Sequence, residues 1–152
     1  MNFEKKRNII FVLFLLIMFS ILSFSCIKKE YKYSDVAYFA EPIIQDFCAG
    51  FTKNDYNEFA NYFTLYFSKP IPQESLVTLF TKIGTTIGSY VPNSISYKSV
   101  KKVKNIFIIE YTASFTDETE PVSIILNFEK SLGEFKLVGF TVDSPKLRNT
   151  NN

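Results

Sequence analysis

The apolar residues of this chain change their spacing at Gly88, and that change limits the folds that the chain can form. Before Gly88 they recur every three to four residues, which is typical of amphipathic helices. After it they alternate in short runs bounded by polar turns, which is typical of strands with one buried face. Because the helices come first and the strands last, we expect an α+β domain in which helices cover the apolar face of one sheet.

Three helices are predicted in the first part. The first begins near Ser34 and is interrupted by Pro42, which either kinks it or moves the start of its regular part to Glu41. The second follows the polar stretch "TKND", and the third starts from Pro72. The apolar faces of the second and third helices consist of Tyr56, Phe59, Ala60 and Phe63, and of Leu76, Leu79, Phe80, Ile83 and Ile87.

Four strands are predicted in the second part, from the runs "SISYKSVKKV", "IFIIEYTASF", "VSIILNFEK" and "FKLVGFTVDSP". Short turns join them, so they form an antiparallel meander. The two central strands each direct a row of apolar residues to one face: Phe107, Ile109, Tyr111, Ala113 and Phe115 in one, and Val122, Ile124, Leu126 and Phe128 in the other.

The N-terminal segment has the pattern of a secretory signal. Lys5, Lys6 and Arg7 precede an apolar run from Ile9 to Leu22, and a small-residue stretch leads to Cys26. An uncleaved membrane helix is the alternative, because residues 9–27 reach the roughly 20 residues that span a bilayer. A buried core helix is disfavoured, because the segment is apolar on every face.

The stretch "LSFSC" resembles the lipobox of bacterial lipoproteins, in its relaxed form as in spirochaetes and some other bacteria. Ser25 fits the small position before the cysteine, whereas Phe24 is bulky and the aliphatic Leu22 lies one place upstream. The resemblance implies cleavage before Cys26 and attachment of palmitate-type acyl chains, and several chains together give stable anchoring. Ile27 is not the acidic residue of an inner-membrane retention signal, which favours the outer membrane.

The chain therefore divides into a lipoprotein signal peptide (1–25), a tether (26–33), one α+β domain (34–145) and a flexible tail (146–152). From Cys26 onward it has 14 basic and 14 acidic residues, which leaves no electrostatic basis for binding nucleic acid. The basic tether either touches anionic headgroups or is a solvated linker.

Histidine is absent from the chain, which removes the usual general base and zinc ligand and every triad that contains histidine. The serines lack a nucleophile-elbow pattern, and no glycine-rich phosphate loop is present. The acidic turn "TDETE" lacks the ligand spacing of a calcium loop. We expect no metal and no cofactor.

Tyrosines are the main candidates for a binding site. Tyr62, Tyr66, Tyr90 and Tyr111, with Tyr97 beside them, either line a pocket or are core and rim aromatics whose hydroxyls have partners. The basic run "SVKKVKN" either meets a phosphate or a headgroup, or is a solvated hairpin. Cys48 lies in a helical apolar pattern and is predicted to be a small buried residue.

The helix end "IGSY" with Gly88 and Tyr90, followed by "YTASF" and by Gly139 and Phe140, resembles the cone-shaped α+β superfamily of ketosteroid isomerase and nuclear transport factor 2. The resemblance covers residues 36–144. It implies a curved, cystatin-like sheet wrapped around a helix, with a pocket open at one end. Enzymes of this superfamily use an Asp or His base with Tyr or Asp donors, and no residue here maps onto such a site.

Three functions follow as hypotheses. The preferred one is a lipid-anchored cell-envelope module that binds a small apolar ligand or an envelope protein without catalysis. The second is an isomerase or hydrolase that uses a carboxylate and tyrosines in the cone. The third is a structural or assembly lipoprotein, which would show an exposed apolar patch or sheet edge.

Overall fold

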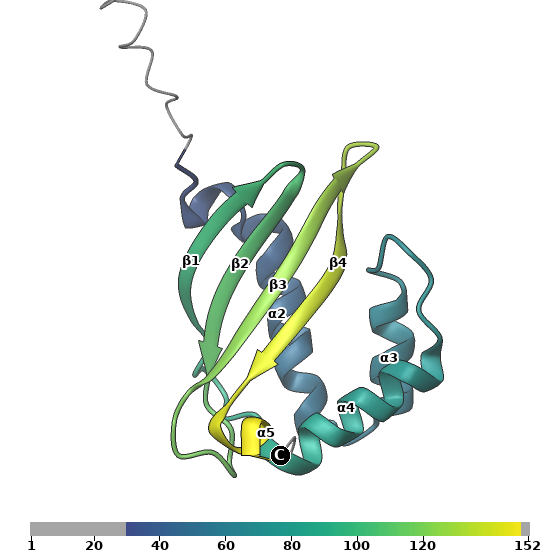
Figure 1. Ribbon diagram of the computed structural model, residues 1–152, viewed down its shortest axis with the longest axis vertical. Helices are drawn as coiled ribbons and strands as arrows, with labels where there is room; N and C mark the ends of the chain where they lie inside the picture. Colours follow the sequence, from purple (N-terminus) through teal and green to yellow (C-terminus); the bar gives the residue numbers. More distant parts are fainter. Residues whose placement is uncertain (1–29, 150–152) are drawn as a thin grey trace, which may run out of the picture. The chain divides into compact units, whose positions relative to one another are not determined.

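A computed structural model describes residues 30–149 (Figure 1). The predicted signal peptide and the first half of the predicted tether, including Cys26, lie outside the described residues. The order of elements is η1 (Tyr33–Asp35), α2 (Ala37–Lys53), α3 (Tyr56–Thr64), α4 (Gln73–Ile87), β1 (Ser96–Val103), β2 (Ile106–Ala113), β3 (Val122–Ser131), β4 (Glu134–Asp143) and α5 (Pro145–Asn149). The predicted α+β class, with helices before strands, is confirmed. None of the helices in the described range is long and apolar enough to cross a membrane.

The four strands form the predicted meander, with every neighbouring pair antiparallel and the order β1-β2-β3-β4. Along β2 and β3 buried and half-buried residues alternate, because successive side chains point to opposite faces of the sheet. Tyr111 on β2 lies opposite Tyr97 on β1 and Ile124 on β3. The inward row of apolar residues predicted for each central strand is therefore confirmed.

Helix α2 lies along the inner face of this sheet (Figure 1). Near its start, Phe39 stacks on Phe135 of β4 with ring centroids 3.9 Å apart and meets Phe107 of β2 edge-on. Near its end, the ring of Phe51 lies 5.8 Å from that of Phe115. Cys48 on this helix is buried and free, as predicted, and burial raises the pKa of its thiol to about 12.

Helices α3 and α4 pack against each other, and their phenylalanines fill the space toward β4. Phe80 of α4 stacks on Phe140 of β4 at 5.4 Å between ring centroids, and it also lies 5.5 Å from Phe63 of α3. Close packing of the two helices depends on Gly84, because a Cβ there would lie 1.9 Å from the Tyr56 hydroxyl.

The first helix starts differently from the prediction. Helix α2 begins at Ala37 after the short η1 turn, Val36 is its N-cap without a side-chain hydrogen bond, and Pro42 lies inside it. The regular part therefore does not begin at Glu41. Pro42 is the sixth residue of α2, so it removes the backbone hydrogen bond to the carbonyl of Tyr38.

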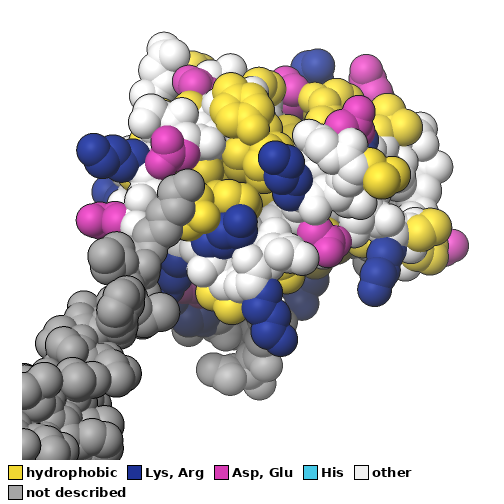
Figure 2. Space-filling model, turned by 90° about the horizontal axis from the view of Figure 1, so that it is seen from above, with side chains coloured by type: hydrophobic (Ala, Val, Ile, Leu, Met, Phe, Trp, Pro, Cys, Tyr) yellow, Lys and Arg dark blue, Asp and Glu magenta, His cyan; other side chains and the backbone are white. Residues whose placement is uncertain are grey.

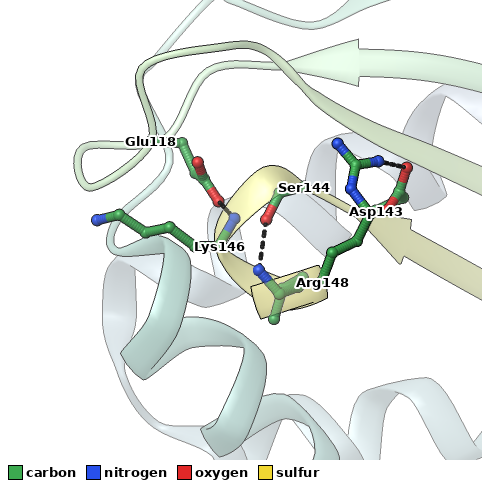
Figure 3. Close-up of polar contacts among 6 residues, drawn as sticks. Glu118, Asp143, Ser144, Lys146 and Arg148 are labelled. Carbon is green, nitrogen blue, oxygen red and sulfur yellow. Dashed lines mark hydrogen bonds and ion pairs between the residues drawn. The ribbon is translucent and has the colours of Figure 1, made fainter. Parts of the chain in front are cut away.

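The C-terminal segment also differs from the flexible tail predicted from residue 146, because α5 occupies Pro145–Asn149 (Figure 3). The backbone N–H of Lys146 donates to Glu118 at 3.2 Å, and Arg148 forms an ion pair of 2.6 Å with Asp143. Buried Ser144 accepts a hydrogen bond from the backbone N–H of Leu147 at 3.2 Å. Serine at an N-cap followed by proline at the first helical position favours the start of a helix, so Ser144 and Pro145 could have predicted α5 from the sequence.

Candidate functional site

The four candidate tyrosines fall into two separate groups. Tyr62 and Tyr66 lie on and just after α3, whereas Tyr90 precedes β1 and Tyr111 lies in the middle of β2. One tyrosine of each group lines a hollow beside α2: Tyr62 lines the first and Tyr90 the second. The two hollows differ in size and in the state of their hydroxyl groups.

The first group forms a hydrogen-bond chain at the surface. The hydroxyl of Tyr62 donates to the carboxylate of Asp46 at 2.5 Å, and its oxygen lies 2.6 Å from the hydroxyl of Tyr66. Burial and these hydrogen bonds raise the pKa of Tyr62, because both favour the neutral phenol. The hollow beside them has a volume of about 170 Å³, which is small for a ligand site. Its lining also includes Gly50, Lys53 and Glu58.

The second group borders a larger cleft between α2 and the segment that leads into β1. We call this the tyrosine cleft, and its volume is about 650 Å³, within the range of small-molecule sites. Its lining residues are Tyr33, Glu41, Ile44, Gln45, Tyr90, Asn93, Ile95, Ser96 and Tyr97.

Local structure fixes the aromatic walls of the tyrosine cleft. Tyr33 in the η1 turn and Tyr97 on β1 place their ring centroids 4.5 Å apart, with 39° between the ring planes. Tyr90 is held by an isolated antiparallel bridge to Phe115, and its ring lies 6.1 Å from that of Phe115. Three tyrosines from different parts of the chain are therefore held around one hollow.

Tyr111 lies behind the wall of the tyrosine cleft. Its side chain is fully buried, and within the described residues its hydroxyl has no hydrogen-bond partner. Burial raises the pKa of Tyr111, and the nearby charges of Tyr33, Glu41 and Tyr97 raise it further. The ring of Tyr111 lies 6.1 Å from that of Tyr97, which lines the cleft, so Tyr111 packs behind the cleft wall without lining it.

Two residues of the cleft were not among the sequence candidates. Tyr33 was assigned to the tether, and Glu41 was considered only as the start of a helix. A signal for Glu41 was present, because Ile44 and Gln45 lie three and four residues further along α2 and share its helical face. The closeness of Tyr33 to β1 had no local signal, since it depends on how η1 packs on the sheet.

The chemistry of the tyrosine cleft is that of hydrogen bonding and cation binding. Its lining contains one carboxylate and three aromatic rings, and no lysine or arginine. Neither a thiol nor a strained serine lies in this lining. Within residues 30–149, no group of three or more His, Cys, Asp and Glu side chains is placed to hold a metal ion.

Comparison with solved structures returns matches that include one designed and one natural protein. A designed NTF2 protein has a TM-score of 0.46 and 15% identity, covering 68% of this chain and 96% of that chain. An NTF-2-like protein of unknown function from Silicibacter pomeroyi has a TM-score of 0.46 and 7% identity, covering 74% of this chain and 100% of that chain. No protein-family model and no curated protein sequence matches the chain. The α+β class rests on the helices and strands described above.

Proposed function

We propose that this protein is a lipid-anchored, cell-envelope binding protein that holds a small molecule in the tyrosine cleft without chemical reaction. The observation that carries the proposal is the lining of the tyrosine cleft, where the rings of Tyr33, Tyr90 and Tyr97 and the carboxylate of Glu41 surround one hollow of about 650 Å³.

The lining indicates the class of ligand. Aromatic faces attract organic cations, and a carboxylate adds a full negative charge that an ammonium group can face. Tyr33 and Tyr97 supply a close pair of rings, and Glu41 supplies the carboxylate. We therefore propose a small molecule with an ammonium group and an apolar body, rather than the purely apolar ligand expected from the sequence.

A carboxylate-and-tyrosine isomerase or hydrolase is the second candidate, because Glu41 lines the tyrosine cleft together with Tyr33, Tyr90 and Tyr97. Glu41 is exposed on α2, however, whereas a general base of this type is usually placed in an apolar pocket that tunes its pKa. We rank binding above catalysis for this reason.

The binding proposal is tested with choline and with its neutral isostere 3,3-dimethylbutan-1-ol as probes. Titration calorimetry of the full chain in detergent should show binding of choline at least tenfold tighter than that of the neutral compound. Glu41→Gln should remove most of that difference, whereas Glu58→Gln, beside the smaller hollow, should leave it unchanged. Equal affinity for both probes, or no binding of either, would overturn the proposal.

The anchoring proposal has its own test, which is the intact mass of the protein extracted from membranes. The expected product begins at Cys26 and carries acyl chains, and Cys26→Ala should abolish both processing and acylation. A mass that still includes residues 1–25 and no acyl chains would show that the anchor is an uncleaved segment instead.

A further inference from the structure

One end of the α+β domain carries exposed apolar and basic side chains together. It consists of the β1–β2 turn with its flanks (residues 101–106) and the β3–β4 turn with its flanks (residues 129–136), which we call the hairpin end. Ile106 pairs with Glu129 across β2 and β3, so the two turns lie side by side. We propose that the hairpin end docks on an anionic lipid surface and orients the domain on its membrane.

The chain enters the domain at this same end. Tyr31, at the start of the described residues, meets Phe107 edge-on with ring centroids 5.0 Å apart, and Phe39 at the start of α2 stacks on Phe135. Cys26 is four residues before Glu30, a reach of at most about 14 Å for an extended chain. An anchor at Cys26, or a retained N-terminal segment, would hold the hairpin end near the bilayer. Only this step rests on the proposed anchoring.

Apolar side chains project from the hairpin end without a role in the core. Leu132 is completely exposed at the β3–β4 turn, Val103 is 52% exposed at the β1–β2 turn, and Tyr38 nearby on α2 is 69% exposed. Leu132 also has a φ of 51°, where Asn or Gly is the ordinary choice. Leucine is unfavourable here for two reasons, the positive φ of its backbone and the exposure of its apolar side chain to water. Its presence indicates a partner that buries this side chain.

Charge identifies the partner as an anionic surface. The two segments of the hairpin end contain five lysines and two glutamates, and one of these glutamates, Glu134, is paired with Lys136 at 3.2 Å. The neighbouring residues 30–38 add one positive charge, from Lys32, and two negative charges, from Glu30 and Asp35. The net charge of this end therefore stays positive. Each lysine near an anionic leaflet strengthens attachment about fivefold.

The lysines are arranged as they are at a membrane interface. The Nζ atom of Lys102 lies 4.8 Å from the ring centroid of Phe107, and that of Lys130 lies 5.5 Å from the ring centroid of Phe135. Figure 2, which looks onto this end, shows apolar side chains in the middle of the face with lysines beside and around them. Aromatic rings with lysine ammonium groups above them are typical of side chains that lie at the boundary between the acyl chains and the lipid headgroups.

The proposal is tested with the full chain reconstituted in vesicles that contain a lipid-borne nitroxide quencher. Ser131→Cys, next to Leu132, carries a fluorophore at the hairpin end, and Glu120→Cys carries it in the loop at the opposite end of β2 and β3. The unsubstituted chain, labelled in the same way, supplies the background from Cys26. Vesicles of phosphatidylcholine alone are compared with vesicles in which about one-third of the lipid is phosphatidylglycerol.

We expect quenching at position 131 to exceed that at position 120, and to be stronger in the anionic vesicles. Lys101→Glu with Lys104→Glu should weaken docking at least about tenfold and reduce quenching at position 131 to the level of the neutral vesicles. Lys53→Glu with Lys146→Glu makes the same change of net charge at the opposite end and should leave quenching unchanged.

Three outcomes would overturn the proposal: equal quenching at both positions, independence from lipid charge, or equal effects of the two double substitutions. Choline titration of the same variants separates this result from the binding function. The tyrosine cleft contains none of the four lysines, so choline affinity should be unchanged in every variant.

Discussion

The hydroxyl of Tyr62 on α3 donates to the carboxylate of Asp46 on α2 at 2.5 Å, and this hydrogen bond links two helices that also pack through their phenylalanines. The oxygen of Tyr62 is also 2.6 Å from the hydroxyl of Tyr66, so its hydrogen-bonding capacity is used. Tyr62 therefore differs from Tyr111, whose hydroxyl is buried without a partner in the described part of the chain. The two tyrosines should respond in opposite ways to removal of the hydroxyl.

Replacement of Tyr62 by Phe should lower the free energy of unfolding by about 1 kcal/mol, because a charge-assisted hydrogen bond between α2 and α3 is lost. Denaturant titration followed by circular dichroism measures this change. Tyr38→Phe, at a tyrosine that is 69% exposed, is the matched control and should have no effect. An equal loss of stability in both variants would contradict the assigned role of the hydrogen bond.

Replacement of Tyr111 by Phe should raise the free energy of unfolding of the ligand-free protein by about 1 kcal/mol, because the variant no longer buries an unsatisfied hydroxyl. Choline affinity should be unchanged in this variant, because the hydroxyl of Tyr111 does not line the tyrosine cleft. A fall in stability would show that an ordered water or another group already completes this hydroxyl in the free protein.

Stability should fall as the pH rises above about 10, the ordinary pKa of tyrosine. The pKa values of Tyr62 and Tyr111 are raised in the folded state, mainly by burial, so the unfolded chain loses these protons first. This contribution is fully present below the unfolded pKa and is lost as the pH rises toward the folded one, at no more than about 1.4 kcal/mol per pH unit for Tyr111. The contribution of half-exposed Tyr62 is smaller because of solvent screening.

Unfolding titrations at a series of alkaline pH values measure this slope. The double variant Tyr62→Phe, Tyr111→Phe should show a shallower decline than the unsubstituted protein, because lysines and the other tyrosines titrate equally in both. Identical slopes would mean that these two phenols do not account for the alkaline loss.

Replacement of Gly50 by Ala should destabilise the domain even though alanine favours helices. A Cβ at position 50 would lie 2.6 Å from ring atoms of buried Phe59, so α2 and α3 would have to separate. Overpacking of this kind costs about 1–3 kcal/mol, which exceeds the helix preference of roughly 1 kcal/mol for alanine over glycine. Gly139→Ala is the control, since its nearest atom, Nδ2 of Asn127, is 3.7 Å away. A thermal midpoint of Gly50→Ala at or above that of Gly139→Ala would contradict this packing.

The types and order of the main elements were predictable because each depends on local spacing. In β2 the alternation of apolar and polar residues is enough to predict that the side chain of Tyr111 points into the core. In α4 the spacing of the apolar residues from Leu76 to Ile87 defines one helical face. Helix boundaries were less predictable. The η1 turn before α2 and the α5 helix after β4 are held by contacts with distant residues, such as that of Lys146 with Glu118.

Periodicity and residue chemistry were enough to predict an α+β domain, the inward-facing rows of the sheet, a buried Cys48 and a set of candidate tyrosines. Tertiary structure alone decided which tyrosines act together. Tyr62 bonds to Asp46 and Tyr66, whereas Tyr90 and Tyr97 line one cleft with Tyr33 and Glu41. The physical reason is that a binding site joins side chains from η1, α2 and β1, and their closeness depends on how α2 packs across the sheet rather than on any local pattern.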